Sequence, residues 1–182
     1  MQDLQQGLGT LVALVNTSPQ VAGAEELGDL DTLRAFVVAR TITEIHEPAL
    51  SDLPELHKLR GRLRAVVTAT GDERLALVNR ALAGATIEPR LVTHDDLGTH
   101  IHYFAPYVSI AEHLGADCLM CVALLIASGE SARLRTCGAP DCSRALLDTS
   151  RNRSRAYCDS QKCGNRLAAA AYRSRRRAPA DR

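Results

Sequence analysis

The chain of 182 residues is long enough for one ordinary domain and a small appendage. Its hydrophobic content of 46% supports a buried core, and aromatic residues make up only 3%, so aliphatic side chains must fill that core. The longest apolar run, residues 118–127, is about half as long as a bilayer requires, and no membrane association is expected.

The net charge of +1 conceals two parts of opposite charge. Residues 1–132 contain 9 Lys and Arg against 17 Asp and Glu, whereas residues 133–182 contain 13 Lys and Arg against 4 Asp and Glu. An acidic body with a basic C-terminal part indicates an anionic partner such as nucleic acid. The alternative is that the basic part folds onto the acidic body and neutralises it.

Apolar residues recur at helical spacing in four segments of the first 84 residues. The predicted helices lie around residues 11–15, 31–38, 53–67 and 75–84. Asp29 or Asp31 is the expected N-cap of the second helix, and Ser51 and Asp52 open the third. Gly71 separates the third helix from the fourth.

Two short strands and one long helix are expected next. The strands span residues 86–93 and 99–104 around a turn at 95–98, and the helix spans residues 107–128. This helix is hydrophobic on nearly all sides, so we expect it at the centre of the domain. The sequence turns basic at residues 129–134, which marks the predicted boundary.

Histidines and cysteines between residues 94 and 121 are candidate metal ligands. His100 and His102 would share one face of a strand, from which both imidazoles could reach a metal, and His94 lies nearby. Two histidines alone are a weak signal, so surface or hydrogen-bonded histidines are the expectation. Cys118 and Cys121 lie in the apolar helix and are expected to be core residues, with His113 as a polar contact in that core.

Four further cysteines form the strongest signal in the sequence. Cys137 and Cys142 have the spacing C-x4-C, and after fifteen residues Cys158 and Cys163 repeat it. Two matched pairs predict one structural zinc ion held by four thiolates. Disulfides and an iron–sulfur cluster are the alternatives. No secretory signal is evident at the N-terminus, so we expect a cytoplasmic protein with reduced thiols.

The region around these cysteines predicts a small treble-clef-like zinc finger. A turn at the first pair leads to a strand at residues 145–147, an arginine-rich loop at 148–155, and a helix from Asp159 or Ser160 to about residue 177. Residues 148–150 have the composition of a turn that fixes the loop. Because this unit has almost no core of its own, we expect metal removal to unfold residues 133–177 and to leave the helical body intact.

The segment Cys163-Gly164-Asn165-Arg166 and the preceding stretch 147–155 resemble the CGNR zinc finger family. Residues 1–130 resemble, more weakly, the helical ABATE domain that usually precedes this finger and is described as a stress-induced transcription regulator. The family often has Arg-Trp before the third cysteine, where this chain has Ala156 and Tyr157. The resemblance implies DNA binding.

The expected fold is therefore mainly α. A helical domain with a small β-hairpin (1–130, a sensor or dimerisation domain) precedes the finger (133–177), and a disordered tail (178–182) follows. The expected function is DNA-binding transcription regulation without enzymatic activity, because four thiolates leave zinc no open position and no catalytic motif is evident. RNA binding, a protein-interaction module and an enzyme that uses a pocket in the helical domain are the alternatives. A homodimer and a small-molecule effector are further partners considered.

The residues expected to contact nucleic acid are basic, apart from one asparagine. They are Arg144, Arg151, Arg153, Arg155, Asn165, Arg166, Arg173, Arg175, Arg176 and Arg177. Two of them, Asn165 and Arg166, could instead brace the metal site. The last three could instead form a frayed, solvated helix end.

Overall fold

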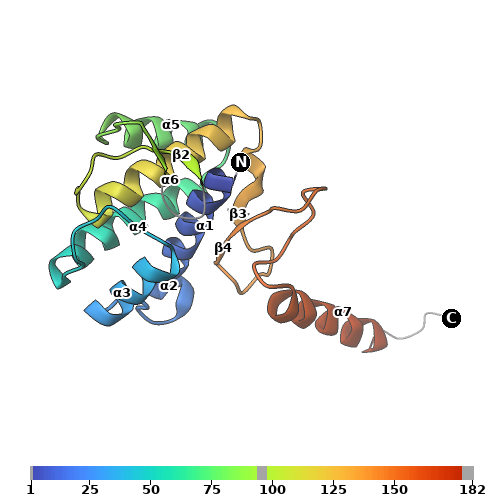
Figure 1. The fold of residues 1–182 in the computed structure, drawn as a ribbon. Coiled ribbons are helices and arrows are strands. Elements are labelled where there is room, and N and C mark those ends of the chain that lie inside the picture. Colours follow the sequence, from blue (N-terminus) through green and yellow to red (C-terminus); the bar gives the residue numbers. More distant parts are fainter. Residues whose placement is uncertain (1, 94–97, 178–182) are drawn as a thin grey trace.

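The computed structural model describes residues 2–93 and 98–177, and shows a helical body, a finger hairpin packed against it, and a last helix that extends from it (Figure 1). The body contains α1 (Gln2–Asn16), α2 (Pro19–Ala22), α3 (Leu30–Ala39), η1 (Leu50–Asp52), α4 (Leu53–Thr68), α5 (Gly71–Ala83), β1 (Arg90–Thr93), β2 (Thr99–His102) and α6 (Ile110–Ala127). It is followed by η3 (Ser131–Arg133), β3 (Leu134–Thr136), β4 (Ala145–Leu147), the π-turn η4 (Ser160–Gly164) and α7 (Asn165–Arg177). Most of the expected turn at 95–98, the nearby His94 and the expected tail lie outside the described residues.

Helix α6 is central to the body, as its sequence predicts. It packs against α1, α4 and α5, and Cys118 and Val122 at its centre are completely buried. By length and composition alone α6 could cross a membrane, but 61% of it is buried inside the protein. A central position in the core therefore accounts for its apolar character.

Local caps fix where two of the helices begin. Asp29 is the N-cap of α3, where its carboxylate accepts a hydrogen bond from the amide of Thr32 at 2.8 Å. Ser109 caps α6 in the same way and exchanges hydrogen bonds with Glu112. Each pair satisfies amide groups that the first turn of a helix leaves without partners. Of the two N-caps expected for the second helix, Asp29 is the one used.

The two strands of the body form an antiparallel hairpin, which is shorter than predicted. Arg90 pairs with His102, and Thr93 pairs with Thr99. His100 and His102 are both buried, because alternate residues of a strand share one face and this face of β2 is covered. Of the two expected alternatives, surface or hydrogen-bonded histidines, this pair is of the hydrogen-bonded kind.

The finger hairpin β3–β4 is part of the body's core rather than a separate unit. Leu134 of β3 and Ala145 of β4 are buried in the same apolar cluster as residues of α1, α4 and α6. Strand β4 contacts α1, and β3 contacts α4. Figure 1 shows β4 beside α1. The sequence suggested a finger that relies on metal alone, whereas half of it also relies on the helical body.

A buried arginine joins the end of α4 to the segment before the finger. The guanidinium of Arg74 donates to the carbonyl oxygens of Val66, Val67 and Ala69, which the end of a helix leaves without partners. It also donates to the carbonyl of Ser131 at 2.6 Å. Arg74 therefore anchors the residues that lead from α6 into the hairpin.

Candidate metal centre and arginine-rich surface

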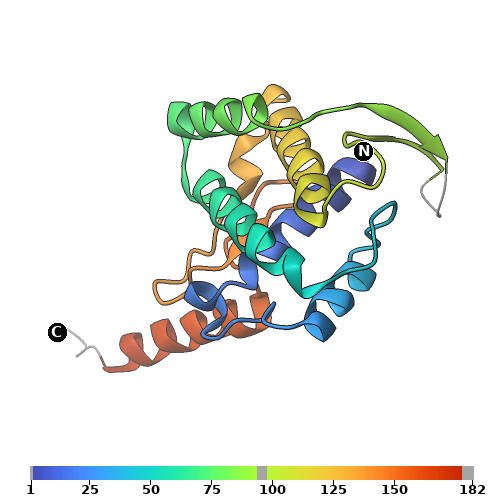
Figure 2. The same ribbon diagram turned by 90° about the vertical axis from the view of Figure 1, so that its left-hand side faces the viewer.

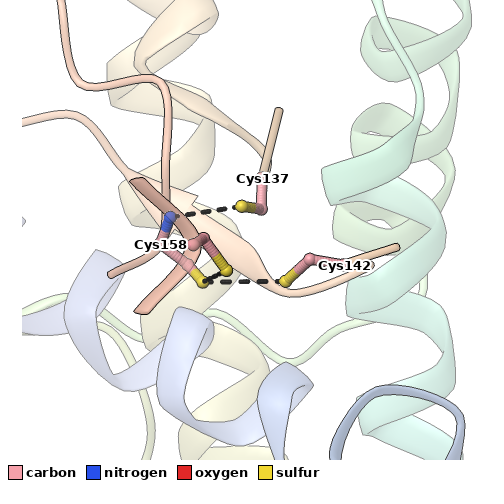
Figure 3. Close-up of side chains that lie close together, drawn as sticks. Cys137, Cys142 and Cys158 are labelled. Carbon is pink, nitrogen blue, oxygen red and sulfur yellow. Dashed lines mark hydrogen bonds between the residues drawn. The ribbon is translucent and has the colours of Figure 1, made fainter. Parts of the chain in front are cut away.

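The four predicted cysteines come together in the structure. Their Sγ atoms all lie within 4.8 Å of one another. The sulfur of Cys158 is 3.7 Å from that of Cys142 and 3.8 Å from that of Cys163. Figure 3 shows the side chains of Cys137, Cys142 and Cys158 directed into one common space.

These distances fit one zinc ion. Four sulfurs at about 2.3 Å from a tetrahedral zinc lie about 3.8 Å apart, whereas a disulfide needs about 2.05 Å. All four cysteines are free thiols. Burial, together with hydrogen bonding to the neighbouring sulfurs, raises the pKa of Cys158 to about 12, so four thiolates can coexist here only around a cation. The group is able to hold one zinc ion, and its four ligands make it a closed, structural site.

Backbone hydrogen bonds hold the first cysteine pair against the third cysteine. The amide of Cys137 donates to the carbonyl of Arg144 at 2.8 Å, and the amide of Gly138 donates to the carbonyl of Ala156 at 2.8 Å. The amide of Cys158 in turn donates to the sulfur of Cys137 at 3.4 Å. A Cβ atom on Gly138 would lie 3.2 Å from that Ala156 oxygen, so the glycine permits this close approach.

The fourth cysteine is placed by the turn that begins the last helix. Asp159 is its N-cap, and the carboxylate accepts hydrogen bonds from the amides of Gln161 and Lys162 at 2.8 and 3.0 Å. Cys163 follows in η4 and is buried, as expected for a ligand in the first turn. The sequence prediction of a cap at this position is confirmed.

Arg166 braces the metal centre in this structure. Its guanidinium donates to the carboxylate of Asp141 at 2.6 Å and approaches the sulfur of Cys163 at 3.9 Å. Asp141 lies inside the first cysteine pair and Arg166 lies in α7, so the ion pair ties the two halves of the cluster together. This contact corresponds to the bracing alternative for Arg166. Asn165 is exposed at the start of α7.

Asp148 organises the arginine-rich loop. Its carboxylate is completely buried and accepts hydrogen bonds from the amide and hydroxyl of Ser150 and from the amide of Arg155 at 3.0 Å. Burial would raise the pKa of Asp148, but these hydrogen bonds and the charge of Arg135 outweigh it and lower the pKa. The predicted loop-fixing turn is therefore built around one ionised carboxylate.

Two arginines that sequence reasoning did not single out hold the loop from inside. Arg135 donates to the Asp148 carboxylate and to the carbonyl of Arg155, both at 2.6 Å. Arg133 donates to the carbonyls of Asp148 and Ser150 at 3.0 and 2.8 Å. No sequence signal distinguishes these two arginines from their exposed neighbours, because their role depends on the buried carboxylate they face.

The arginines predicted to contact nucleic acid occupy different environments. Arg151 and Arg173 are exposed, and Arg144 is half-buried. Arg153 pairs with Glu130 at 2.7 Å, and Arg155 donates to the carbonyls of Tyr157 and Cys158. The backbone of Arg175, Arg176 and Arg177 belongs to α7, but the described part of the structure does not extend to their side chains.

The two predicted regions match two known families. Residues 133–176 match the CGNR zinc finger. Residues 9–129, more than half of the chain, match ABATE, which is described as "Putative stress-induced transcription regulator". The chain belongs to the ABATE family. The order of the ABATE region and the finger confirms the resemblance seen in the sequence, and the comparison with curated proteins gives no match. Together with the four-cysteine cluster, these matches indicate a zinc-finger protein with a regulatory role.

Proposed function

We propose that the chain is a transcription regulator that binds duplex DNA through the loop 149–155 and helix α7. The observation that carries the proposal is the way the loop is held. Arg133, Arg135 and Asp148 engage its backbone from inside, and the side chain of Arg151 is left exposed. Because the loop backbone is already ordered, binding a phosphate through this loop avoids the entropy cost of ordering that backbone.

Helix α7 supports DNA rather than RNA as the partner. It projects away from the helical body (Figure 2), and its 13 residues make it about 20 Å long. Ala168, Ala169 and Ala170 are exposed, so this stretch of the helix presents only small side chains to solvent. A helix of this kind fits the major groove of B-form DNA, about 12 Å wide, whereas the deep, narrow major groove of A-form RNA does not admit one.

The positive charge of the C-terminal part also supports DNA as the partner. The part of the chain from residue 133 onward carries 13 Lys and Arg against 4 Asp and Glu. Several of these arginines are engaged within the protein, so Arg151, Arg173 and the last turn of α7 are the groups assigned to phosphate contacts. Such contacts position a protein on the duplex without reading its sequence.

A direct comparison of duplexes tests this proposal. The zinc-loaded full chain is titrated against a fluorescent random-sequence DNA duplex and against an RNA duplex of equal length at the same salt concentration. We expect tighter binding to DNA, and selection from a random DNA pool should enrich a preferred site. Equal or tighter binding to the RNA duplex would favour the RNA alternative, and no binding to either would leave the protein-interaction alternative.

A further inference from the structure

The helical body contains a cavity of about 440 Å³ that the finger does not use. It is lined by parts of α1, β2 and α6, and by the segment after α3. Its polar lining includes the carboxylates of Asp3 and Asp117 and three histidines, His100, His102 and His113. Arg40 also lines this cavity, so two carboxylates and three imidazoles stand against one guanidinium, and this balance favours a cation.

The side chains of His100 and His102 face each other at this cavity. Their Nε2 atoms are 3.0 Å apart, and both residues are buried, with exposed fractions of 6% and 7%. The ring centroids lie 4.9 Å apart with planes tilted by 59°. The rings therefore approach through their nitrogens rather than by stacking.

The other nitrogen of each ring faces an oxygen that can only accept a hydrogen bond. Nδ1 of His100 is 2.9 Å from the carbonyl oxygen of Gly98, and Nδ1 of His102 is 3.2 Å from a carboxylate oxygen of Glu44. Glu44 also accepts a hydrogen bond from Arg90 at 2.8 Å, which favours its ionised form. In a neutral imidazole the single proton then lies on Nδ1, and Nε2 carries a lone pair.

Two lone pairs directed at each other across 3.0 Å repel unless a cation lies between them. Imidazoles bound to zinc commonly have this arrangement, with the far N–H donated to a carboxylate or a carbonyl. Two nitrogens at about 2.0–2.1 Å from a tetrahedral zinc lie about 3.3 Å apart, so a small rotation of either ring produces that geometry.

We propose that His100 and His102 bind a divalent transition-metal ion such as Zn²⁺ through their Nε2 atoms, with Glu44 positioning His102. With two ligands drawn from the described residues, coordination positions are left for water or a small ligand in the cavity. His113 lies nearby, its ring centroid 6.4 Å from that of His102, and its buried Nδ1 has no hydrogen-bond partner within the described residues. That nitrogen offers an acceptor to a metal-bound water or ligand. This site is separate from the four cysteines and does not depend on DNA binding.

Metal titration of the full chain tests the proposal. Protein that already holds one zinc ion is titrated with Zn²⁺ or Co²⁺, and binding is followed by calorimetry and elemental analysis. We expect one further ion per chain. His100→Ala and His102→Ala should each lose this ion, whereas His57→Ala, which removes a half-buried histidine outside the cavity, should keep it. Glu44→Gln should weaken the binding about tenfold, and Glu47→Gln, an exposed control, should leave it unchanged.

The unaltered protein provides a second readout if a histidine variant fails to fold. Long-range ¹H–¹⁵N spectra report which imidazole nitrogen carries a proton, and Zn²⁺ should shift the Nε2 signals of His100 and His102 but not those of His57. Absence of a second ion at millimolar Zn²⁺ would overturn the proposal. So would Nε2 signals that stay protonated as Zn²⁺ is added, because a proton would then be the cation between the rings.

Discussion

Asn16, the last residue of α1, exchanges two hydrogen bonds with the backbone of Ala145 in strand β4. Its Nδ2 donates to the carbonyl of Ala145 at 3.0 Å, and its Oδ1 accepts from the amide of Ala145 at 2.7 Å. The two residues are 129 positions apart in the sequence. The side chain of Asn16 therefore acts as one more strand partner for β4 and joins the ABATE region to the finger.

Replacing Asn16 by Ala should destabilise the protein by about 2 kcal/mol, because two buried backbone groups of Ala145 lose their partners. Chemical denaturation of the zinc-loaded protein measures this change. Ser18→Ala is the control, since the buried hydroxyl of Ser18 has no hydrogen-bond partner in the described part of the chain. Equal stability of the two variants would show that the Asn16 contact contributes nothing.

Zinc removal should unfold only the outer part of the finger. The sulfur cluster and η4 depend on the ion, whereas Leu134 and Ala145 are buried in the body's core. Hydrogen exchange with and without chelator should therefore show lost protection in η4 and at residues 137–144, and retained protection in β3 and β4. Loss of protection across the whole hairpin would instead mean that the finger folds as an independent unit.

Asp148→Asn should loosen the arginine-rich loop. An amide group cannot accept every hydrogen bond that the buried carboxylate receives from Ser150, Arg155 and Arg135, and its NH2 would face donors. The amides of Ser150 and Arg155 should exchange faster, and affinity for DNA should fall because Arg151 is no longer held in place. Asp31→Asn, at an exposed acid of α3, is the control for the change in charge.

Arg166→Ala should speed the transfer of zinc to a competing chelator by about tenfold, because the variant loses the contact that ties Asp141 to the Cys163 side of the cluster. Asp141→Asn should act in the same direction, and the double variant should be no worse than the more severe single variant. Arg173→Ala, on the same helix, should retain zinc normally. Normal zinc retention in Arg166→Ala, with weaker binding to one DNA sequence only, would instead assign Arg166 to base reading.

Patterns local to the sequence predicted most of the fold and the metal centre. Helical spacing predicts α3, α4, α5 and α6, and the sequence offers Asp29 as one of two N-caps for α3. The spacing of the cysteines predicted the cluster, because zinc geometry restricts which pairs can meet. The apolar surroundings of Cys118 predicted its burial correctly.

Relationships between distant residues could not be predicted in this way. Nothing in the sequence indicates that Asn16 meets Ala145, or that Arg135 rather than Arg151 turns inward to Asp148. The packing of the finger hairpin on the body could not be predicted for the same reason, because burial of Leu134 depends on a surface formed by other helices. Which arginines are exposed and which turn inward therefore depends on the tertiary fold.

The salt dependence of DNA binding tests the central claim most directly. For the zinc-loaded chain, the logarithm of the association constant should fall linearly with the logarithm of salt concentration. The double variant Arg151→Ala and Arg173→Ala should reduce this slope by about 1.8, which corresponds to two phosphate contacts. A control with the same charge change on the body, Arg62→Ala and Arg80→Ala, should keep the original slope. Binding that is insensitive to salt, or equal slopes for the two double variants, would contradict the proposed DNA interface.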